Sequence, residues 1–201
     1  MRYILVFLLL VSWEVLSAQS EEFMAEIEQY RTAHKEKFAN GGENSPLTPE
    51  QIPSMQFFDA NEKFRVSASF ELTPKEKPFE IPTSSGKTKP FVKYGIATFH
   101  LEGSEYQLAI YKNLRTTRMP MFRDFLFLPF QDDTNGESTY GGGRYIDLKV
   151  GDIEDGKLTI DFNKAYNPYC AYGDGWNCPI PPVENILEVE IAAGEKNYKK
   201  E

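Results

Sequence analysis

Three carboxylates in the second half of the chain, Asp147, Asp161 and Glu184, are the candidates for acid–base chemistry. Asp147 and Asp161 lie on two alternating segments that could pair as a hairpin. One register places the two acids opposite each other, where they could share a proton or bind a hard cation. A register shifted by two residues places Lys149 against Asp161 instead, and the sequence leaves both registers open.

Arg144 carries the charge that most needs a partner. Alternation in the predicted strand 140–150 places its guanidinium on the apolar side, facing the core. A carboxylate such as Glu184 or Glu195 could satisfy it as a structural ion pair. If no protein carboxylate reaches Arg144, it becomes an anion site, beside glycines that let a ligand approach the backbone. We favour the structural pair, because buried charges are usually satisfied within the protein.

Neutral hydrogen-bonding groups cluster near the same segments. Asparagines beside prolines could contact a ligand, but they equally often satisfy turn backbone. We predict a binding pocket surrounded by Tyr140, Arg144, Asn163, Tyr166, Asn167, Glu184 and Asn185.

The two cysteines of the chain, Cys170 and Cys178, lie close together across a glycine-containing loop. We predict a disulfide, which on the chain-entropy model would add about 2.5 kcal/mol of stability. A buried unpaired thiol and a reactive thiolate are the alternatives, and the latter would need a base such as His100. A bridge would fix the loop aromatics, which could stack on a sugar ring or pack over the sheet.

Other motifs fail on their spacing. The Gly-Lys-Thr at 86–88 has Ile81 where a phosphate-binding loop needs glycine, and the Gly-Gly-Gly-Arg at 141–144 precedes a strand rather than a helix. The two histidines, His34 and His100, lie in different segments, so no zinc constellation can be built from them. We therefore predict no cofactor and no metal site.

The elements that must position these residues are mostly strands. Apolar residues at helical spacing predict a helix over 21–39, with His34 packed on its apolar side. Alternation then predicts strands over 64–72, 91–101, 105–112, 125–130, 140–150, 157–163 and 186–192. The expected fold is a mostly β single domain, an antiparallel sandwich or barrel-like structure with an N-terminal helix.

The first residues favour export. Residues 1–18 combine Arg2, an apolar run and small residues before Gln19, a pattern typical of a cleavable signal peptide. We expect a helical lead over 19–54, a β domain over 55–201, no transmembrane segment in the mature chain, and a periplasmic or extracellular location. The net charge of −8 disfavours nucleic acid and anionic membranes as partners. The sequence does not indicate an oligomeric state.

Four segments carry a resemblance to a known family. They read TYGGGRYIDL at 139–148, DFNKAYNPYCAY at 161–172, CPIPPVEN at 178–185 and AGEK at 193–196. They resemble the bacterial and archaeal family called domain of unknown function 1684 (DUF1684). The resemblance runs from about Phe23 onward and is most specific after Phe125. It implies no active site, since the family is uncharacterised.

Three functions are compatible with these residues. The first is a small-molecule or glycan binding module built around the predicted pocket. The second is a structural or interaction protein of the cell envelope, in which the polar residues only satisfy loops. The third is a hydrolase-like enzyme that uses Asp161 with Glu184 or Asp147 as acid and base. The sequence leaves open whether the protein is an enzyme.

Overall fold

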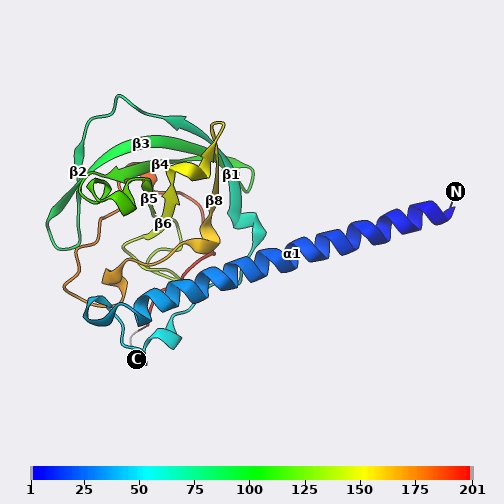
Figure 1. Ribbon diagram of the computed structural model, residues 1–201, viewed down its shortest axis with the longest axis horizontal. Helices are drawn as coiled ribbons and strands as arrows, with labels where there is room; N and C mark the ends of the chain where they lie inside the picture. The colour runs from blue at the N-terminus through cyan, green and yellow to red at the C-terminus, as the bar shows by residue number, and fades with distance from the viewer. Residues whose placement is uncertain (1, 200–201) are drawn as a thin grey trace.

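The computed structural model describes the backbone of residues 2–199 and the side chains of residues 21–199 (Figure 1). One long helix is followed by strands joined by turns and short 3-10 helices. The elements are α1 (Arg2–Ala39), β1 (Arg65–Leu72), β2 (Phe79–Pro82), β3 (Thr88–Leu101), β4 (Ser104–Asn113), β5 (Phe125–Phe130), β6 (Arg144–Lys149), β7 (Ile153–Glu154) and β8 (Lys157–Asp161). The predicted fold class, a mostly β antiparallel single domain with an N-terminal helix, is confirmed.

The strands form a single curled antiparallel sheet that does not close. Its order is β6-β5-β4-β3-β1-β8-β7, and β2 pairs with β3. The curl brings β6 near β8, because residues of both strands line one cavity. A bridge between Tyr145 and Tyr166 joins β6 to the segment after β8. The sheet is therefore barrel-like, with a gap between its two ends.

The C-terminal half of α1 packs against the domain, as Figure 1 shows. The side chains of Phe23, Ile27, His34 and Phe38 are buried, which matches the predicted apolar face. The helix ends at the predicted residue, Ala39, but it begins at Arg2. The side chains of residues 1–18, on which the prediction of a signal peptide rests, lie outside the described residues. Among residues with described side chains, we find no helix with the length and hydropathy of a membrane span.

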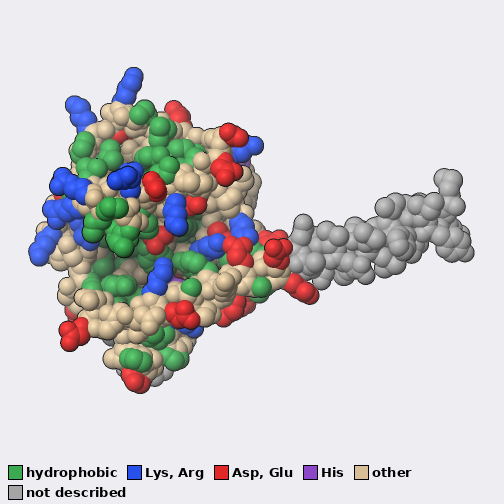
Figure 2. All heavy atoms as spheres, viewed as in Figure 1, with side chains coloured by type: hydrophobic (Ala, Val, Ile, Leu, Met, Phe, Trp, Pro, Cys, Tyr) green, Lys and Arg blue, Asp and Glu red, His purple; other side chains and the backbone are tan. Residues whose placement is uncertain are grey.

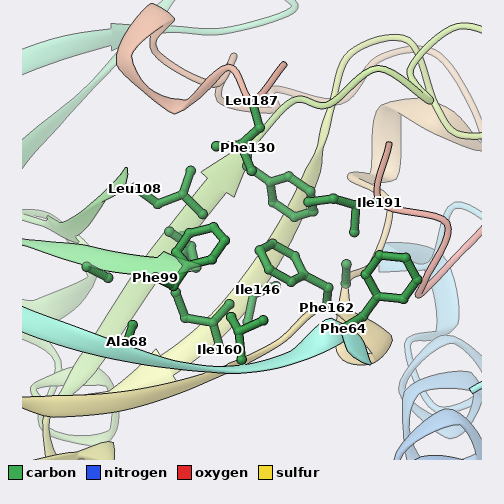
Figure 3. Packing of buried hydrophobic residues seen from close by; sticks show 14 of the residues in the cluster. Phe64, Ala68, Phe99, Leu108, Phe130, Ile146, Ile160, Phe162, Leu187 and Ile191 are labelled. Atoms are coloured by element: carbon green, nitrogen blue, oxygen red, sulfur yellow. The ribbon is translucent and has the colours of Figure 1, made fainter. Parts of the chain in front are cut away.

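The main hydrophobic core fills the concave side of the sheet (Figure 3). Aromatic side chains dominate its centre, where the Phe162 ring lies 5.2 Å from that of Phe130 and 5.7 Å from that of Phe99. Leu187 and Ile191, from the C-terminal segment, close one end of this core. The core therefore includes residues far apart in the sequence.

The outer face of β3 to β6 carries a second apolar cluster, comprising Ile81, Phe91, Ala109, Tyr111, Phe127 and Tyr145. In β5, Leu126 and Leu128 point into the main core, whereas Phe127 points into the second cluster. This part of the sheet is therefore covered on both faces, which explains why β5 is apolar at every position.

The hairpin that the sequence left possible between 140–150 and 157–163 does not form, since β6 pairs with β5 and β8 pairs with β1. The strand predicted over 186–192 is wrong, because this segment is not a strand, although its side chains alternate between buried and exposed. It lies beside the residues after β5, and its backbone groups bond to residues 131–133 and to Arg144 instead of to a neighbouring strand.

The buried guanidinium of Arg144 holds that segment in place. It pairs with Asp132 at 2.7 Å, with both side chains at 0% exposure. It also donates to the carbonyl oxygens of Ile191, at 2.9 Å, and Ala193. The partner is therefore Asp132, and neither Glu184 nor Glu195 forms the ion pair suggested by the sequence. Arg144 supplies hydrogen bonds that a strand partner would otherwise provide.

We expect Arg144→Ala to lower the free energy of unfolding by about 3–5 kcal/mol, because Asp132 would be left buried without its partner. Urea denaturation followed by circular dichroism measures this loss. Arg123→Ala, at an exposed position, serves as the control and should change stability by less than about 0.5 kcal/mol. A loss below about 1 kcal/mol for Arg144→Ala would contradict the structural role of this pair.

Candidate functional site

A cavity of about 540 Å³ lies on the outer face of β3 to β6. Its floor is aromatic, formed by Phe91, Phe125, Phe127 and Tyr145. Its cover comes from the end of α1, from Tyr166 and from the disulfide loop, which we define as residues 168–179. The contributing side chains of the cover are His34, Lys37, Phe38, Tyr166, Pro168, Tyr169, Trp176, Asn177, Cys178 and Pro179. Its volume falls within the range of small-molecule sites.

Ring contacts fix the aromatic floor. Phe91 and Phe127 stack with ring centres 5.5 Å apart, and Phe127 meets Tyr145 edge-on at 4.7 Å. The Tyr145 hydroxyl donates a 2.5 Å hydrogen bond to the carbonyl oxygen of Pro179, which joins the floor to the disulfide loop. The floor is therefore rigid and apolar, which suits a flat ring.

The disulfide loop is attached to the sheet through β2. Cys170 and Cys178 form the predicted bridge, with Cα atoms 6.3 Å apart. The backbone of Ser84 donates to the Cys178 carbonyl oxygen at 2.9 Å, and Thr83 forms a β-bridge with Pro179. The bridge therefore holds a loop that is already anchored at one end.

Two aromatic rings of the disulfide loop pack together at the cavity. Tyr169 and Trp176 meet edge-on with ring centres 4.9 Å apart. Both line the cavity, as does Cys178. The bridge therefore fixes part of the cavity wall.

Two lysines line the cavity, one from the sheet and one from the helix. Lys89 Nζ donates to the carbonyl oxygen of Asn177 at 2.6 Å, and burial lowers the pKa of Lys89, with a further contribution from the nearby positive charge of Arg115. Lys37 lines the cavity from the helix side. Both lysines could approach an anionic group on a ligand.

Asp147 and Tyr166 form a hydrogen-bonded pair in the cavity wall. The Tyr166 hydroxyl donates to Asp147 Oδ1 at 2.5 Å. Desolvation by the surrounding protein raises the pKa of Asp147, while the Tyr166 hydrogen bond and the charges of Lys37 and His34 act in the opposite direction. The Asp147 side chain still reaches solvent, so this desolvation is partial. The pair provides a carboxyl group that can exchange a proton with a bound ligand.

His34 lines the cavity from α1 and is surrounded by aromatic rings. Its side chain is 6% exposed, and Nε2 lies 3.6 Å from the buried carboxylate of Glu195. The Glu195 carboxylate also accepts hydrogen bonds from the Tyr172 hydroxyl at 2.5 Å and from the Asn167 backbone at 2.9 Å. This agrees with the sequence interpretation of His34 as a packed residue on the apolar side of the helix.

The structure brings only Tyr166 of the predicted binding residues into this cavity. Tyr140 lies in the turn before β6 and does not line the cavity. Glu184 bonds to Lys93 at 2.5 Å and accepts from the Tyr111 hydroxyl at 2.6 Å. The other four, all buried and bonded within the protein, are Arg144, Asn163, Asn167 and Asn185.

The three asparagines join segments of backbone. Asn185 bonds to both the amide and the carbonyl of Ala109, each at 2.8 Å. Asn163 bonds to the amide and the carbonyl of Asn61 in the same way. Asn167 donates to the carbonyl oxygen of Lys196 at 2.8 Å. Their side chains are therefore engaged with backbone, the alternative that the sequence left open.

The predicted carboxylates are divided between two places. Asp147 and Asp161 both line a second, polar cavity of about 460 Å³ at the gap between β6 and β8. Asp161 is ion-paired with Arg65 at 2.7 Å, whereas Glu184 belongs to neither cavity lining. Within residues 21–199, no group of three or more His, Cys, Asp or Glu side chains is arranged to hold a metal ion.

Sequence reasoning missed the lysines and the phenylalanine floor. Lys37 and Lys89 lie in segments that were assigned only structural roles. One sequence feature could have indicated the floor: the uninterrupted apolar run of 125–130, which is typical of a strand covered on both faces. If both faces of a strand are covered, a second layer must lie on the outer face of the sheet. Cavities often form at the edge of such a layer.

The fold and the site define a class of open, curled antiparallel β domains with an aromatic cavity on the outer face of the sheet. The chain belongs to the family described as Protein of unknown function (DUF1684), whose model matches residues 50–196. The family expected from the sequence is confirmed. No curated protein matches the chain.

One similar solved structure is the solution NMR structure of an uncharacterized protein of Haloarcula marismortui, from gene locus rrnAC0354. It is 30% identical, with a TM-score of 0.67, and the match covers 89% of this chain and 96% of that chain. The likeness extends over nearly the whole domain.

We expect the double substitution Cys170→Ser, Cys178→Ser to lower the free energy of unfolding by about 2.5 kcal/mol, because the eight-residue separation closes a small loop. Urea denaturation of both proteins measures this difference. Adding reductant should destabilise the wild type and leave the double variant unchanged. Equal effects of reductant on both proteins would contradict the role of the bridge.

We expect Asp147→Asn to raise the melting temperature at neutral pH. A raised pKa means that the folded state disfavours the ionised carboxyl, so the stability contributed by Asp147 falls as pH rises above its ordinary value of 3.8. The difference in melting temperature between the variant and the wild type should therefore become smaller as the pH falls towards 3.8. Calorimetry across this pH range measures it, with the exposed Glu154→Gln as control. A variant less stable than wild type at neutral pH would contradict this assignment.

Proposed function

We propose that this protein binds a small molecule composed of a flat apolar ring and an anionic group. The cavity on the outer face of β3 to β6 supports this proposal through its aromatic floor and its two lysines, Lys37 and Lys89. A ring would stack on Phe91 and Phe127, while the anionic group would lie near the lysines. A glycan is a weaker match, since sugar recognition relies on many hydroxyl partners and this floor is largely apolar.

Binding is favoured over the other two functions by how the polar residues are engaged. The hydrolase alternative needs two carboxyl groups that converge in one cleft. Asp147 and Asp161 do line one cavity, but Asp161 is ion-paired with Arg65, and Glu184 is ion-paired with Lys93 outside that cavity. The purely structural alternative does not account for an open cavity between rigid walls. The cavity itself is the observation that carries the proposal.

The test uses Trp176 as a reporter, because it lines the cavity. The chain has two tryptophans, so Trp13→Phe leaves Trp176 as the sole tryptophan, which is excited selectively over the tyrosines at the red edge of the absorption band. We expect 2-naphthoate to quench this emission saturably and to bind about tenfold more tightly than neutral 2-naphthamide, since a hydrogen bond to a charged group contributes about 1.5 kcal/mol or more.

Lys89→Met should remove the preference for the acid, whereas the control Lys87→Met, on the exposed turn two residues away, should retain it. Glucuronate is titrated in parallel as a sugar acid. The absence of saturable quenching by either naphthalene compound would refute the proposal. Saturable binding of glucuronate alone would show that the ligand is a glycan and not a flat apolar ring.

A further inference from the structure

The turn that links β4 to β5 exposes apolar side chains at its end. Met119 is 47% exposed, Met121 80% and Phe122 37%. Two short 3-10 helices, Thr116–Arg118 and Pro120–Phe122, shape this turn. Proline at the start of the second one restricts the backbone, so the exposed side chains are presented from a defined turn. We name residues 115–124 the tip.

Positive charge surrounds these apolar side chains. The tip contains three arginines and one acid: Arg115, Arg118, Arg123 and Asp124. All three arginines are exposed, and none forms an ion pair with another residue in the part of the chain with described side chains, 21–199. Lys149, opposite Phe125 in the strand register, adds a further positive charge nearby. Hydrophobic and basic side chains gather together over the turn after β4, beside a hollow in this face (Figure 2).

We propose that the tip docks onto the surface of a bilayer that contains anionic lipid. Three apolar side chains with arginines beside them match the two layers of a bilayer surface, because the apolar groups enter the acyl boundary while the guanidinium groups meet the phosphates. A protein partner is a weaker match, since three side chains offer far less than the roughly 800 Å² per partner of a stable protein interface.

The net charge of −8 predicts repulsion from anionic membranes for the chain as a whole. Charges act over only about 8 Å at physiological salt, so the sign of the surface in contact decides the interaction. The tip carries three positive charges against one negative charge within ten residues. The acidic remainder of the surface is repelled and so restricts docking to this orientation.

The position of the tip would place the cavity at the bilayer. Asn113 and Thr116, at the start of the turn, and Phe125, at its end, line the cavity. A ligand that partitions into membranes would then have a short path into the site. Docking itself does not depend on the proposed ligand, so vesicle binding and naphthoate binding can each fail without the other.

The chain also offers a matched control surface. Val183 is 84% exposed, with Ile180 at 42% and Ile186 at 47%. These apolar side chains are surrounded in sequence by Glu184, Glu188 and Glu190, all exposed. This second patch equals the tip in apolar exposure and has the opposite charge.

The experiment places a single tryptophan in each patch of the full-length chain. Phe122→Trp, the tip reporter, and Val183→Trp, the control reporter, are made separately in a background with Trp13→Phe and Trp176→Phe, and circular dichroism confirms folding. Vesicles contain about 30% phosphatidylglycerol in phosphatidylcholine, with pure phosphatidylcholine for comparison. We expect the emission of the tip reporter to shift to the blue with anionic vesicles, and brominated lipid to quench it, while the emission of the control reporter stays unchanged.

Further substitutions test the two parts of the interaction. Adding Met121→Ser should weaken vesicle binding, read from the blue shift of the tip reporter, about tenfold, through the loss of a buried apolar side chain. Arg118→Ala should weaken it about fivefold, and about 1 M salt should abolish it.

Three outcomes would overturn the proposal. In the first, no blue shift occurs for the tip reporter. In the second, the shifts are equal for the tip and control reporters, or equal with neutral and anionic vesicles. In the third, the chain self-associates in ultracentrifugation without vesicles and Met121→Ser abolishes this, which would assign the tip to a protein contact.

Discussion

The buried guanidinium of Arg144 is the interaction on which the rest of the structure depends. It compensates Asp132 and binds the backbone of the C-terminal segment through the carbonyls of Ile191 and Ala193. The same segment contains Glu195, whose carboxylate accepts hydrogen bonds from the Tyr172 hydroxyl and the Asn167 backbone. Asn167 immediately precedes the disulfide loop, and Tyr172 lies within it. A single buried charge thus connects the core to the cover of the cavity, and removing it would disturb both.

The second organising feature is the part of the sheet that is covered on both faces. Alternate residues of β4, β5 and β6 supply the main core on one side and the aromatic cluster on the other. The outer layer consists of the end of one helix, α1, and the irregular disulfide loop. Such a layer cannot fill the surface evenly, and the cavity lies where its two parts meet.

Much of the fold could be predicted from the sequence, because period-two and helical spacings report burial directly. The helix face from Phe23 to Phe38, most strands and the cysteine bridge match the structure. Strand pairing was harder to predict. The alternation in 140–150 and 157–163 shows which face of each strand is buried, but it does not show which strands are neighbours in the sheet. The candidate site was least predictable. Asparagines that could have served a ligand are bonded to backbone, and Lys89 lines the cavity beside Asn177, a neighbour 88 positions away that the sequence does not reveal.

The unclosed seam between β6 and β8 also has a consequence for how the chain assembles. Helix α1 spans part of this seam through contacts as distant in sequence as Tyr30 with Lys164 and Glu26 with Lys164, separated by 134 and 138 positions. Phe38 of α1 packs on Leu47 and Ile52, which are close in sequence, but the contacts of α1 across the seam form only once Lys164, after the last strand, is in place. Long-range closure of this kind is slow, so we expect α1 to dock in a late folding step. Until then, strand edges remain unprotected and open to association with other chains.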